Sequence, residues 1–137
     1  MRSRLPTVTF VMFGLSLAGC ADRLPDQDLR ILQAVPVAKL STEILWTEYQ
    51  ADRRAADRKY WGKAIDVSGK LSTFAPLPAA RVIFLPQPES AAGIEARLLD
   101  ERSAAILTDV AAGQRITLRC FCEGLATNVV LKSCIKP

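Results

Sequence analysis

The chain has 137 residues with 18 basic and 14 acidic side chains, a net charge of +4, and no histidine. The missing histidine excludes Ser-His-Asp and Cys-His catalysis as well as histidine-based metal sites, and it removes the most common general acid or base. The length suffices for one domain with a modest core. We therefore predict a protein that is not an enzyme, with no catalytic residue, no metal and no cofactor.

The first 20 residues combine a short apolar run with a cysteine at its end. Arg2 and Arg4 precede the run, which spans 13 residues from Leu5 to Leu17. A membrane-spanning helix needs about 20 residues, whereas a secretory signal has this shorter length and a basic start. The closing Leu-Ala-Gly-Cys resembles the lipobox of bacterial lipoproteins. That resemblance implies cleavage between Gly19 and Cys20 and acylation of Cys20; the alternative is a plain signal peptide with a coincidental cysteine.

Cleavage at this point divides the chain into three parts. These are a signal peptide over 1–19, a lipid-anchored, solvated tether over 20–39, and a helix with a folded domain over 40–137. The mature chain has 118 residues, 16 of them basic and 14 acidic, so its net charge is +2. So small an excess of positive charge does not indicate a surface that binds nucleic acid or anionic lipid. Acyl chains on Cys20 would hold the protein on a membrane almost permanently.

The residue after the lipidated cysteine indicates which membrane holds the lipid anchor. In enteric bacteria an Asp at this position retains a lipoprotein in the inner membrane, and this chain has Ala21 instead. By that analogy we expect an outer-membrane anchor with the domain facing the periplasm.

A helical pattern follows the tether. Ser41 or Thr42 can cap a helix, and apolar side chains then recur at helical spacing. The pattern predicts one amphipathic helix over 41–60, which ends at Gly62.

Beyond this helix the apolar period changes to two, as in strands. Gly69 lies inside the first strand and suggests a bulge or a sharp bend. An Ala-rich stretch over 101–113 predicts a short helix between the third and fourth strands. The chain is therefore predicted to be mainly β, a five-stranded OB-fold barrel preceded by an amphipathic helix, with an open α+β sheet as the alternative. The predicted strands cover 64–74, 81–86, 94–100, 114–122 and 128–135.

Three segments together resemble a known family. "EYQADRRAADRKYWGKAIDVSG", "VAAGQRITLRCFCEG" and "VVLKSCI" are similar to bacterial lipoproteins with a tRNA-anticodon-binding-like OB domain. The resemblance covers Thr42 to Ile135 and implies an OB-fold on a lipid tether, but no reaction. Asp52 stands where the family usually has Asn. The shared positions are Tyr49, Ala56, Asp57, Tyr60, Gly62, Lys63, Gly113, Gln114, Cys122, Gly124 and Cys134.

Three cysteines remain after lipidation of Cys20. An oxidising compartment predicts one disulfide among Cys120, Cys122 and Cys134, with one thiol left over. Cys120 and Cys122 share an inward face, but a C-x-C loop is too short for a relaxed disulfide. The family resemblance implies a Cys122–Cys134 disulfide and a buried Cys120 thiol. Cys134 has the opposite alternation to its apolar neighbours, a conflict that an irregular strand end would remove.

Two acidic side chains of the predicted helix have the spacing of a catalytic pair. Glu48 and Asp52 are four residues apart and could approach one another. The same charged side of the predicted helix also carries Arg53, Arg54, Asp57, Arg58 and Lys59, which favours a solvated face with ion pairs.

The function predicted from these features is binding. We expect a lipid-anchored envelope module that binds an envelope protein or glycan, while membrane lipid holds it through Cys20. A module for single-stranded nucleic acid is the alternative, because aromatic and basic side chains on an OB face can stack on bases and neutralise phosphates. An enzyme of unknown reaction ranks third. The predicted binding face consists of Trp61, Lys63, Lys70, Arg81, Phe84, Arg97, Arg119 and Phe121.

Overall fold

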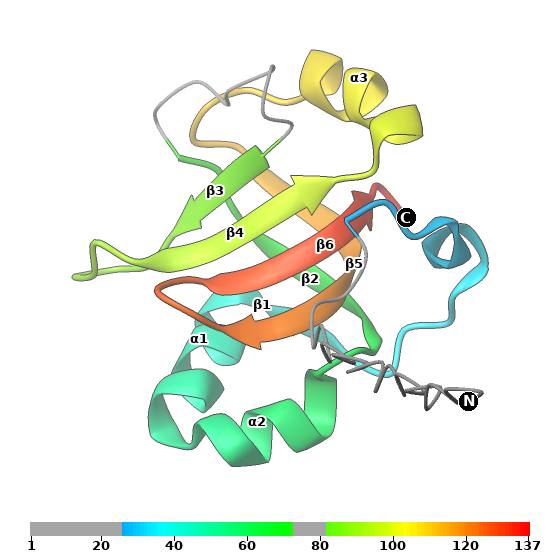
Figure 1. The fold of residues 1–137 in the computed structure, drawn as a ribbon. Helices are drawn as coiled ribbons and strands as arrows, with labels where there is room; N and C mark the ends of the chain where they lie inside the picture. The colour runs from blue at the N-terminus through cyan, green and yellow to red at the C-terminus, as the bar shows by residue number, and fades with distance from the viewer. Residues whose placement is uncertain (1–25, 73–81) are drawn as a thin grey trace, which may run out of the picture.

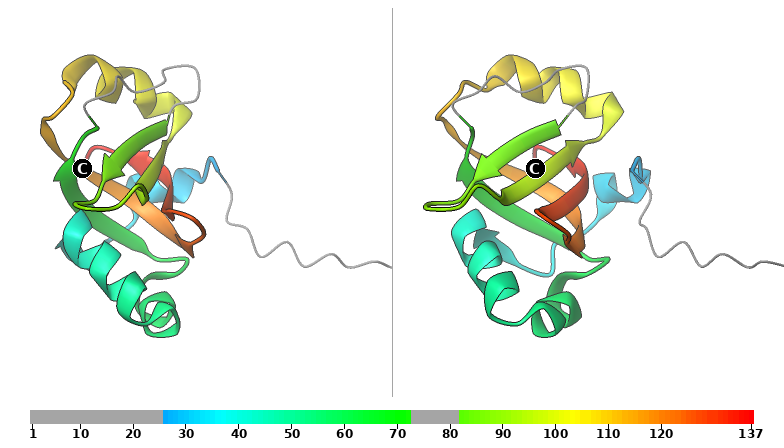
Figure 2. Two further views of the ribbon diagram at one scale, coloured as in Figure 1. Left: turned by 90° about the vertical axis from the view of Figure 1, so that its left-hand side faces the viewer. Right: turned by 60° about the vertical axis from the view of Figure 1, so that its left-hand side comes forward.

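A computed structural model describes residues 26–72 and 82–137. The predicted signal peptide and Cys20 lie outside the described residues. The chain is mainly β, with one six-stranded sheet in the order β1-β2-β5-β6-β4-β3 and helices at both of its ends (Figures 1 and 2). No helix in the described parts of the chain is long and apolar enough to cross a membrane. In chain order the elements are η1 (Leu29–Gln33), β1 (Lys39–Ser41), α1 (Thr42–Ala51), α2 (Arg53–Tyr60), β2 (Ala64–Lys70), β3 (Val82–Pro86), β4 (Gly93–Leu98), α3 (Asp100–Asp109), β5 (Arg115–Leu125) and β6 (Val129–Ile135).

The five predicted strands are present as β2 to β6. β2, β5 and β6 pair antiparallel, β4 joins β6 in parallel, and β3 and β4 form an antiparallel pair. The prediction of a closed five-stranded barrel is wrong in two respects. A sixth strand, β1, pairs with β2 in parallel, and no pairing between β2 and β3 closes the sheet within the described residues. β1 has only three residues, too few to show a period in the sequence.

The predicted helix over 41–60 is divided in two at Asp52. This residue is extended (φ −156°, ψ 99°), and its carboxylate accepts a hydrogen bond from the backbone N–H of Ala55 at 3.0 Å. Asp competes with the helix for backbone donors, so it favours a cap over a helix interior. Asp52 therefore ends α1 and caps α2, which packs at an angle to α1 (Figure 1).

Gly69 gives room to a helix and forms no bulge. It pairs with Ile116 in an unbroken register between β2 and β5, so the predicted bulge is wrong. A Cβ atom at Gly69 would lie 2.4 Å from Cγ2 of the buried Thr42. The glycine thus lets the first residue of α1 approach the sheet, and this contact positions both α1 and α2.

The segment predicted as a tether is folded from residue 26 onward. Ile31 is fully buried in a small cluster with Ala64, Leu99 and Ile135, on the outside of the sheet. The Val37 N–H donates to the Ala64 carbonyl at 2.8 Å. The structure thus attaches residues 26–39 of the predicted tether to the sheet, through the buried Ile31 and through backbone hydrogen bonds.

The last strand contains the irregularity that the sequence required. Ser133 has a left-handed backbone (φ 56°), and the register between β6 and both of its neighbours shifts there. Before the shift Val129 and Leu131 face the core; after it Cys134 does, while Ile135 faces the outer cluster. The bulge adds one residue to β6 and so reverses the alternation.

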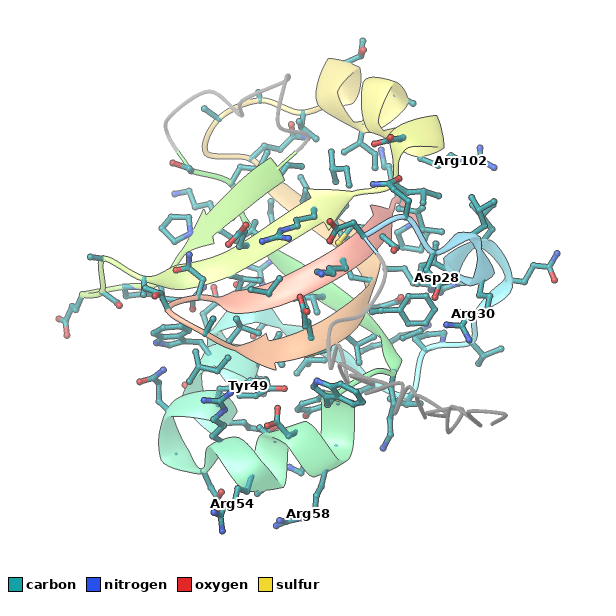
Figure 3. The ribbon with its side chains drawn as sticks, in the orientation of Figure 1. Asp28, Arg30, Tyr49, Arg54, Arg58 and Arg102 are labelled. Atoms are coloured by element: carbon teal, nitrogen blue, oxygen red, sulfur yellow. A yellow bond between two sulfur atoms is a disulfide. The ribbon has the colours of Figure 1, made fainter. Side chains whose placement is uncertain are left out.

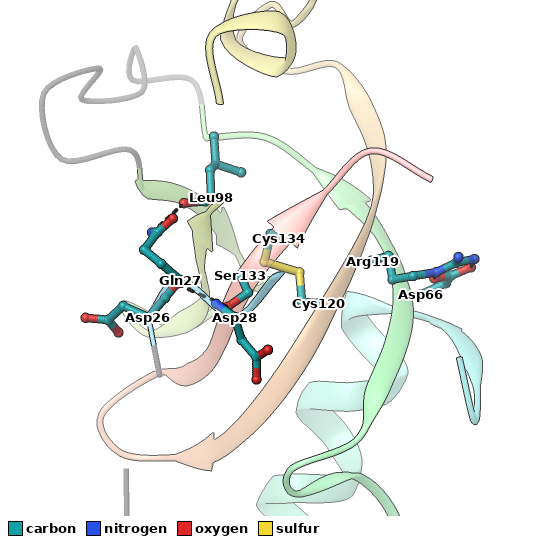
Figure 4. Close-up of a disulfide and its surroundings, with 9 residues drawn as sticks. All are labelled: Asp26, Gln27, Asp28, Asp66, Leu98, Arg119, Cys120, Ser133 and Cys134. Atoms are coloured by element: carbon teal, nitrogen blue, oxygen red, sulfur yellow. Dashed lines mark hydrogen bonds and ion pairs between the residues drawn. A yellow bond between two sulfur atoms is a disulfide. The ribbon is translucent and has the colours of Figure 1, made fainter. Parts of the chain in front are cut away.

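This bulge determines which two cysteines form the disulfide. Cys134 is bonded to Cys120, with 4.3 Å between their Cα atoms, and Cys122 is the buried free thiol (Figure 4). The Cys122–Cys134 pairing that the family resemblance implied is wrong, because β6 pairs residue 122 with Leu131 and brings Cys134 beside residue 120.

Loss of this disulfide should lower the stability of the fold. We expect Cys120→Ala with Cys134→Ala to lower the free energy of unfolding by about 3 kcal/mol in urea titrations. The reason is that the bond joins residues 14 positions apart and so closes a loop in the unfolded chain. Cys122→Ala keeps the disulfide and should cost only about 1 kcal/mol. Peptide mapping without reduction that joins residue 122 to residue 134 would contradict the assignment.

Candidate functional site

An open groove of about 740 Å³ lies between α2 and the outward side of the sheet. The helix supplies one wall, and strands β4, β5 and β6 supply the other. Both walls carry charged side chains, and one large aromatic ring lies between them. The lining residues are Arg53, Asp57, Arg58, Trp61, Arg97, Glu123, Gly124, Leu125, Ala126, Val130 and Lys132.

Trp61 is fixed at the point where α2 ends. Gly62 is left-handed (φ 71°) and turns the chain from the helix toward β2. Its N–H donates to the Cys122 carbonyl at 2.7 Å, and the Cys122 N–H donates to the Lys63 carbonyl at 3.1 Å. These bonds attach the end of α2 to β5, yet Trp61 itself remains 43% exposed. A large, rigid aromatic surface is therefore presented to ligands in the groove.

A buried polar cluster lies beneath this groove and joins both helices to β5. The Tyr49 hydroxyl donates to Oδ1 of Asp57 at 3.1 Å and lies 3.4 Å from Sγ of Cys122. Tyr49 lies between the helices and the sheet, whereas Arg54 extends outward from α2 (Figure 3). Burial raises the pKa of Tyr49 and raises the pKa of Cys122 to about 11. Cys122 is therefore a protonated thiol at neutral pH and a poor nucleophile.

Gly124 completes this cluster through a close approach. It is left-handed (φ 95°), and a Cβ atom there would lie 2.8 Å from Oδ1 of Asp57. Four of the positions shared with the resembled family thus meet where α1 and α2 contact β5, namely Tyr49, Asp57, Cys122 and Gly124. The cluster fixes the width of the groove.

The sheet side of the groove is electrically balanced by ion pairs. Lys132 has a side chain only 5% exposed, and its Nζ lies 2.8 Å from Oδ1 of Asp26 and 3.0 Å from Oε2 of Glu123. Arg97 pairs with Glu95 at 3.1 Å and with Asp26 at 3.4 Å. The hydrogen bond from Lys132, more than any other interaction, holds the pKa of Asp26 below its usual 3.8. Little positive charge therefore remains on the strands for an anionic ligand.

The helix side retains more of its positive charge. Arg53 is well exposed, and its Nε lies 3.8 Å from Asp57. In the described part of the chain the guanidinium of Arg58 has no ion pair, although its carbonyl accepts from Nζ of Lys63 at 2.9 Å. An exposed indole next to these cations suits a ligand with a flat apolar face and an anionic group.

Three residues of the predicted binding face lie at this site. Trp61 and Arg97 line the groove, and Lys63 follows at its edge. Lys70 is exposed at the end of β2 and is not among the groove residues. Arg81 and the side chain of Phe84 lie outside the described residues.

The remaining two predicted face residues are covered by the N-terminal segment. Arg119 donates to both carboxylate oxygens of Asp66, at 2.7 and 3.0 Å, and to the Ala34 carbonyl at 3.3 Å (Figure 4). Phe121 is half-buried, with the guanidinium of Arg30 at 5.9 Å from its ring centre. The predicted eight-residue face is thus wrong as one site, because part of the expected tether packs on β5.

Sequence reasoning missed most of the groove. The sequence pattern places Arg53, Asp57 and Arg58 on a solvated helix face, and the predicted binding face does not include Glu123 or Lys132. A single lysine inside the apolar "NVVLKSCI" was the available signal, since a buried lysine requires acidic partners. Its partner Asp26 lies more than 100 residues away in the chain, where no pattern points to it.

The two acidic side chains of the possible pair have separate partners. Asp52 caps α2, and Glu48 pairs with Nζ of Lys59 at 3.0 Å. Glu48 is thus ion-paired, whereas Asp52 serves as a helix cap. Within residues 26–72 and 82–137, no three acidic or cysteine side chains are grouped as metal ligands.

The fold is a small, mainly β domain with an open groove between a helix and its sheet. The chain belongs to the tRNA_anti-like family, whose profile matches residues 5–135. Its fold is similar to the crystal structure of a putative nucleic acid-binding lipoprotein from Klebsiella pneumoniae, with a TM-score of 0.54 and 12% identity, over 78% of this chain and 94% of that one. Among curated proteins none matches the chain.

The contact at Gly124 should be the most sensitive backbone position of the site. We expect Gly124→Ala to lower the free energy of unfolding by about 2 kcal/mol or more, because the methyl group collides with Asp57 at a left-handed residue. Gly62→Ala is the matched control: it is also left-handed but has open space around it, and it should cost only about 1 kcal/mol. Equal losses in thermal or urea unfolding would contradict the role of the close approach.

Proposed function

We propose that this protein is a lipid-anchored OB-type binding module of the cell envelope, without catalytic activity, whose ligand binds in the groove along α2. The observation that carries the proposal is the exposed ring of Trp61, which lies in the groove with two arginines of α2. Backbone hydrogen bonds between the next two residues and β5 hold this tryptophan in place. OB domains bind ligands over the face of their second and third strands. Those strands correspond to β3 and β4, and Arg97 of β4 lines the groove.

Two observations support the lipid anchor. The chain carries Leu-Ala-Gly-Cys after a short apolar run, and its structural neighbour is named a lipoprotein. The proposal includes attachment of Cys20 to the outer membrane and a domain that faces the periplasm.

The chemistry of the groove supports binding without catalysis. The chain has no histidine, and the Cys122 thiol stays protonated at neutral pH. Asp57 accepts a hydrogen bond from Tyr49, and Glu123 pairs with Lys132. Each of these acidic groups is occupied in holding the fold.

An envelope glycan or protein fits the groove best. An indole offers a flat apolar surface to a sugar ring or an aromatic side chain, and Arg58 offers a charged donor to a carboxylate. The ion pairs along the sheet would not attract a polyanion, because their charges already cancel locally.

Single-stranded nucleic acid is the second candidate. It is favoured by the likeness to a putative nucleic acid-binding lipoprotein and by the combination of Trp61 with Arg53 and Arg58. Aromatic stacking and cationic side chains are the means by which OB domains hold single strands.

The anchor predicts the mass of the native protein. After extraction from membranes and alkylation without reduction in denaturant, we expect residues 20–137 plus two or three acyl chains, with one alkyl group on Cys122. An unprocessed chain with a free Cys20 would contradict the anchor.

The groove predicts which side chain controls ligand binding. We expect soluble peptidoglycan fragments to bind the acylated protein in detergent, and Trp61→Ala to weaken that binding about tenfold or more, because a central aromatic contact is removed. Ile44→Ala removes another exposed apolar side chain, which lies outside the groove, and should have no effect.

The same titration separates the two candidates. A single strand of about 15 nucleotides that binds instead of the glycan, with an affinity that falls steeply with salt, would establish the second candidate. Binding that Trp61→Ala leaves unchanged would contradict the groove as the site.

A further inference from the structure

The N-terminal segment carries a row of exposed apolar side chains. Among the described residues six large hydrophobic side chains are exposed, and four of them lie within nine consecutive positions. Single exposed apolar residues are common on protein surfaces, whereas a cluster marks an interaction site. The four residues are Leu29 (53% exposed), Leu32 (36%), Val35 (84%) and Val37 (59%), and we call them the apolar ridge.

The fold holds this ridge in place. Ile31 anchors η1 in the outer cluster, and the Asp28 N–H donates to the Ser133 hydroxyl at 2.8 Å. At its other end the Val37 N–H donates to the Ala64 carbonyl. The ridge side chains are therefore exposed because the backbone directs them outward, and no rearrangement is needed to present them.

The ridge residues lie in two pairs along the segment. In a 3-10 helix residues three apart are eclipsed, so Leu29 and Leu32 project together. Val35 and Val37 follow, two residues apart and both exposed. Buried or half-buried residues alternate with them, namely Ile31, Ala34 and Ala38.

The length of chain before the ridge indicates its partner. Only five residues separate Cys20 from Asp26, where the described chain begins, and a residue spans at most about 3.6 Å. A lipid on Cys20 would thus keep Asp26 within about 20 Å of the membrane surface. So short a link gives the ridge a high effective concentration at the bilayer, so that even a weak apolar contact is formed.

We infer that the apolar ridge is a membrane-docking surface, which inserts into the lipid interface beside the acylated Cys20 and fixes the orientation of the domain. The inference rests on the anchor in the proposed function. Arg30 is paired with Asp28, so the segment bears little net charge. Docking should therefore depend on the apolar side chains and not on anionic lipid.

Photo-cross-linking to lipid tests this inference. The acylated protein, extracted from membranes, is reconstituted in phosphatidylcholine vesicles with benzoylphenylalanine at one position. Val35→benzoylphenylalanine places the probe on the ridge. Arg54→benzoylphenylalanine is the matched control, since Arg54 is also exposed but lies on α2, away from Arg30 and η1 (Figure 3). We expect about tenfold more lipid adduct from position 35 than from position 54, because apolar side chains partition into the bilayer.

A second comparison removes the ridge. With the probe at Leu32, the changes Val35→Asp and Val37→Asp should lower the lipid adduct about tenfold, since both side chains are exposed and the fold tolerates them. Equal adducts at positions 35 and 54, or adducts from position 35 to a second copy of the chain, would overturn the inference.

The mass of the extracted protein separates the two proposals. Acylated protein without lipid adducts at position 35 contradicts the ridge and leaves the anchor intact. Unacylated protein that still forms these adducts contradicts the anchor and supports the ridge, and unacylated protein without adducts contradicts both.

Discussion

The left-handed backbone at Ser133 is the constraint on which the rest of this structure depends. β6 is buried along its whole length between β5 and β4, so one extra residue in it changes contacts on both faces of the sheet. On the inner face the shift brings Cys134 to Cys120. On the outer face it directs Ile135 into the cluster with Ile31, and the Ser133 hydroxyl accepts from the Asp28 N–H and donates to the Asp26 carbonyl. A non-glycine residue in this conformation costs about 1–2 kcal/mol, which the disulfide and the docked segment together offset.

The docked N-terminal segment also determines what the groove can bind. Lys132 is buried in β6, and a buried ammonium is tolerated only with acidic partners. Glu123 lies on the neighbouring strand, but Asp26 comes from the segment that follows the proposed anchor. The same segment covers Arg119 and Phe121, which a bare OB domain would expose. The chain thus occupies part of its own sheet face, and the proposed function places the ligand in the groove along α2.

The sequence predicted those features that depend on local pattern. Alternation found all five long strands, and their order with an intervening helix indicated the topology. Alternation did not predict the features that depend on contacts between residues distant in the sequence. Asp52 reads as one charge on a helix face, yet its carboxylate ends one helix and caps the next. Gly69 suggests a bulge in the sequence, but in the structure it makes room for the side chain of Thr42. The disulfide partner of Cys134 depends on a one-residue shift in β6 that alternation could flag as a conflict but could not resolve. In the groove, residue type was enough to predict Trp61 and Arg97. The position of Lys132 could not be predicted, because it depends on an ion pair with Asp26, which is distant in the sequence.

Charge pairing gives the strongest argument about the class of ligand. A single-stranded nucleic acid gains affinity from each phosphate that a cation neutralises, and the logarithm of its binding constant falls with a slope of about −0.7 for each such contact. Arg97 and Lys132 already face carboxylates, so a polyanion would have to displace Asp26 or accept its repulsion. Beside Trp61 the described residues offer Arg58, Lys63 and Arg53, the last of which already lies 3.8 Å from Asp57. Three phosphate contacts correspond to a slope of about −2 and to weak binding at physiological salt. A neutral or singly charged ligand loses little by this arrangement, because stacking on Trp61 and one charge-assisted hydrogen bond do not require an unpaired basic face. The distribution of ion pairs therefore favours a glycan or a protein segment over a nucleic acid strand, although the overall fold accommodates either.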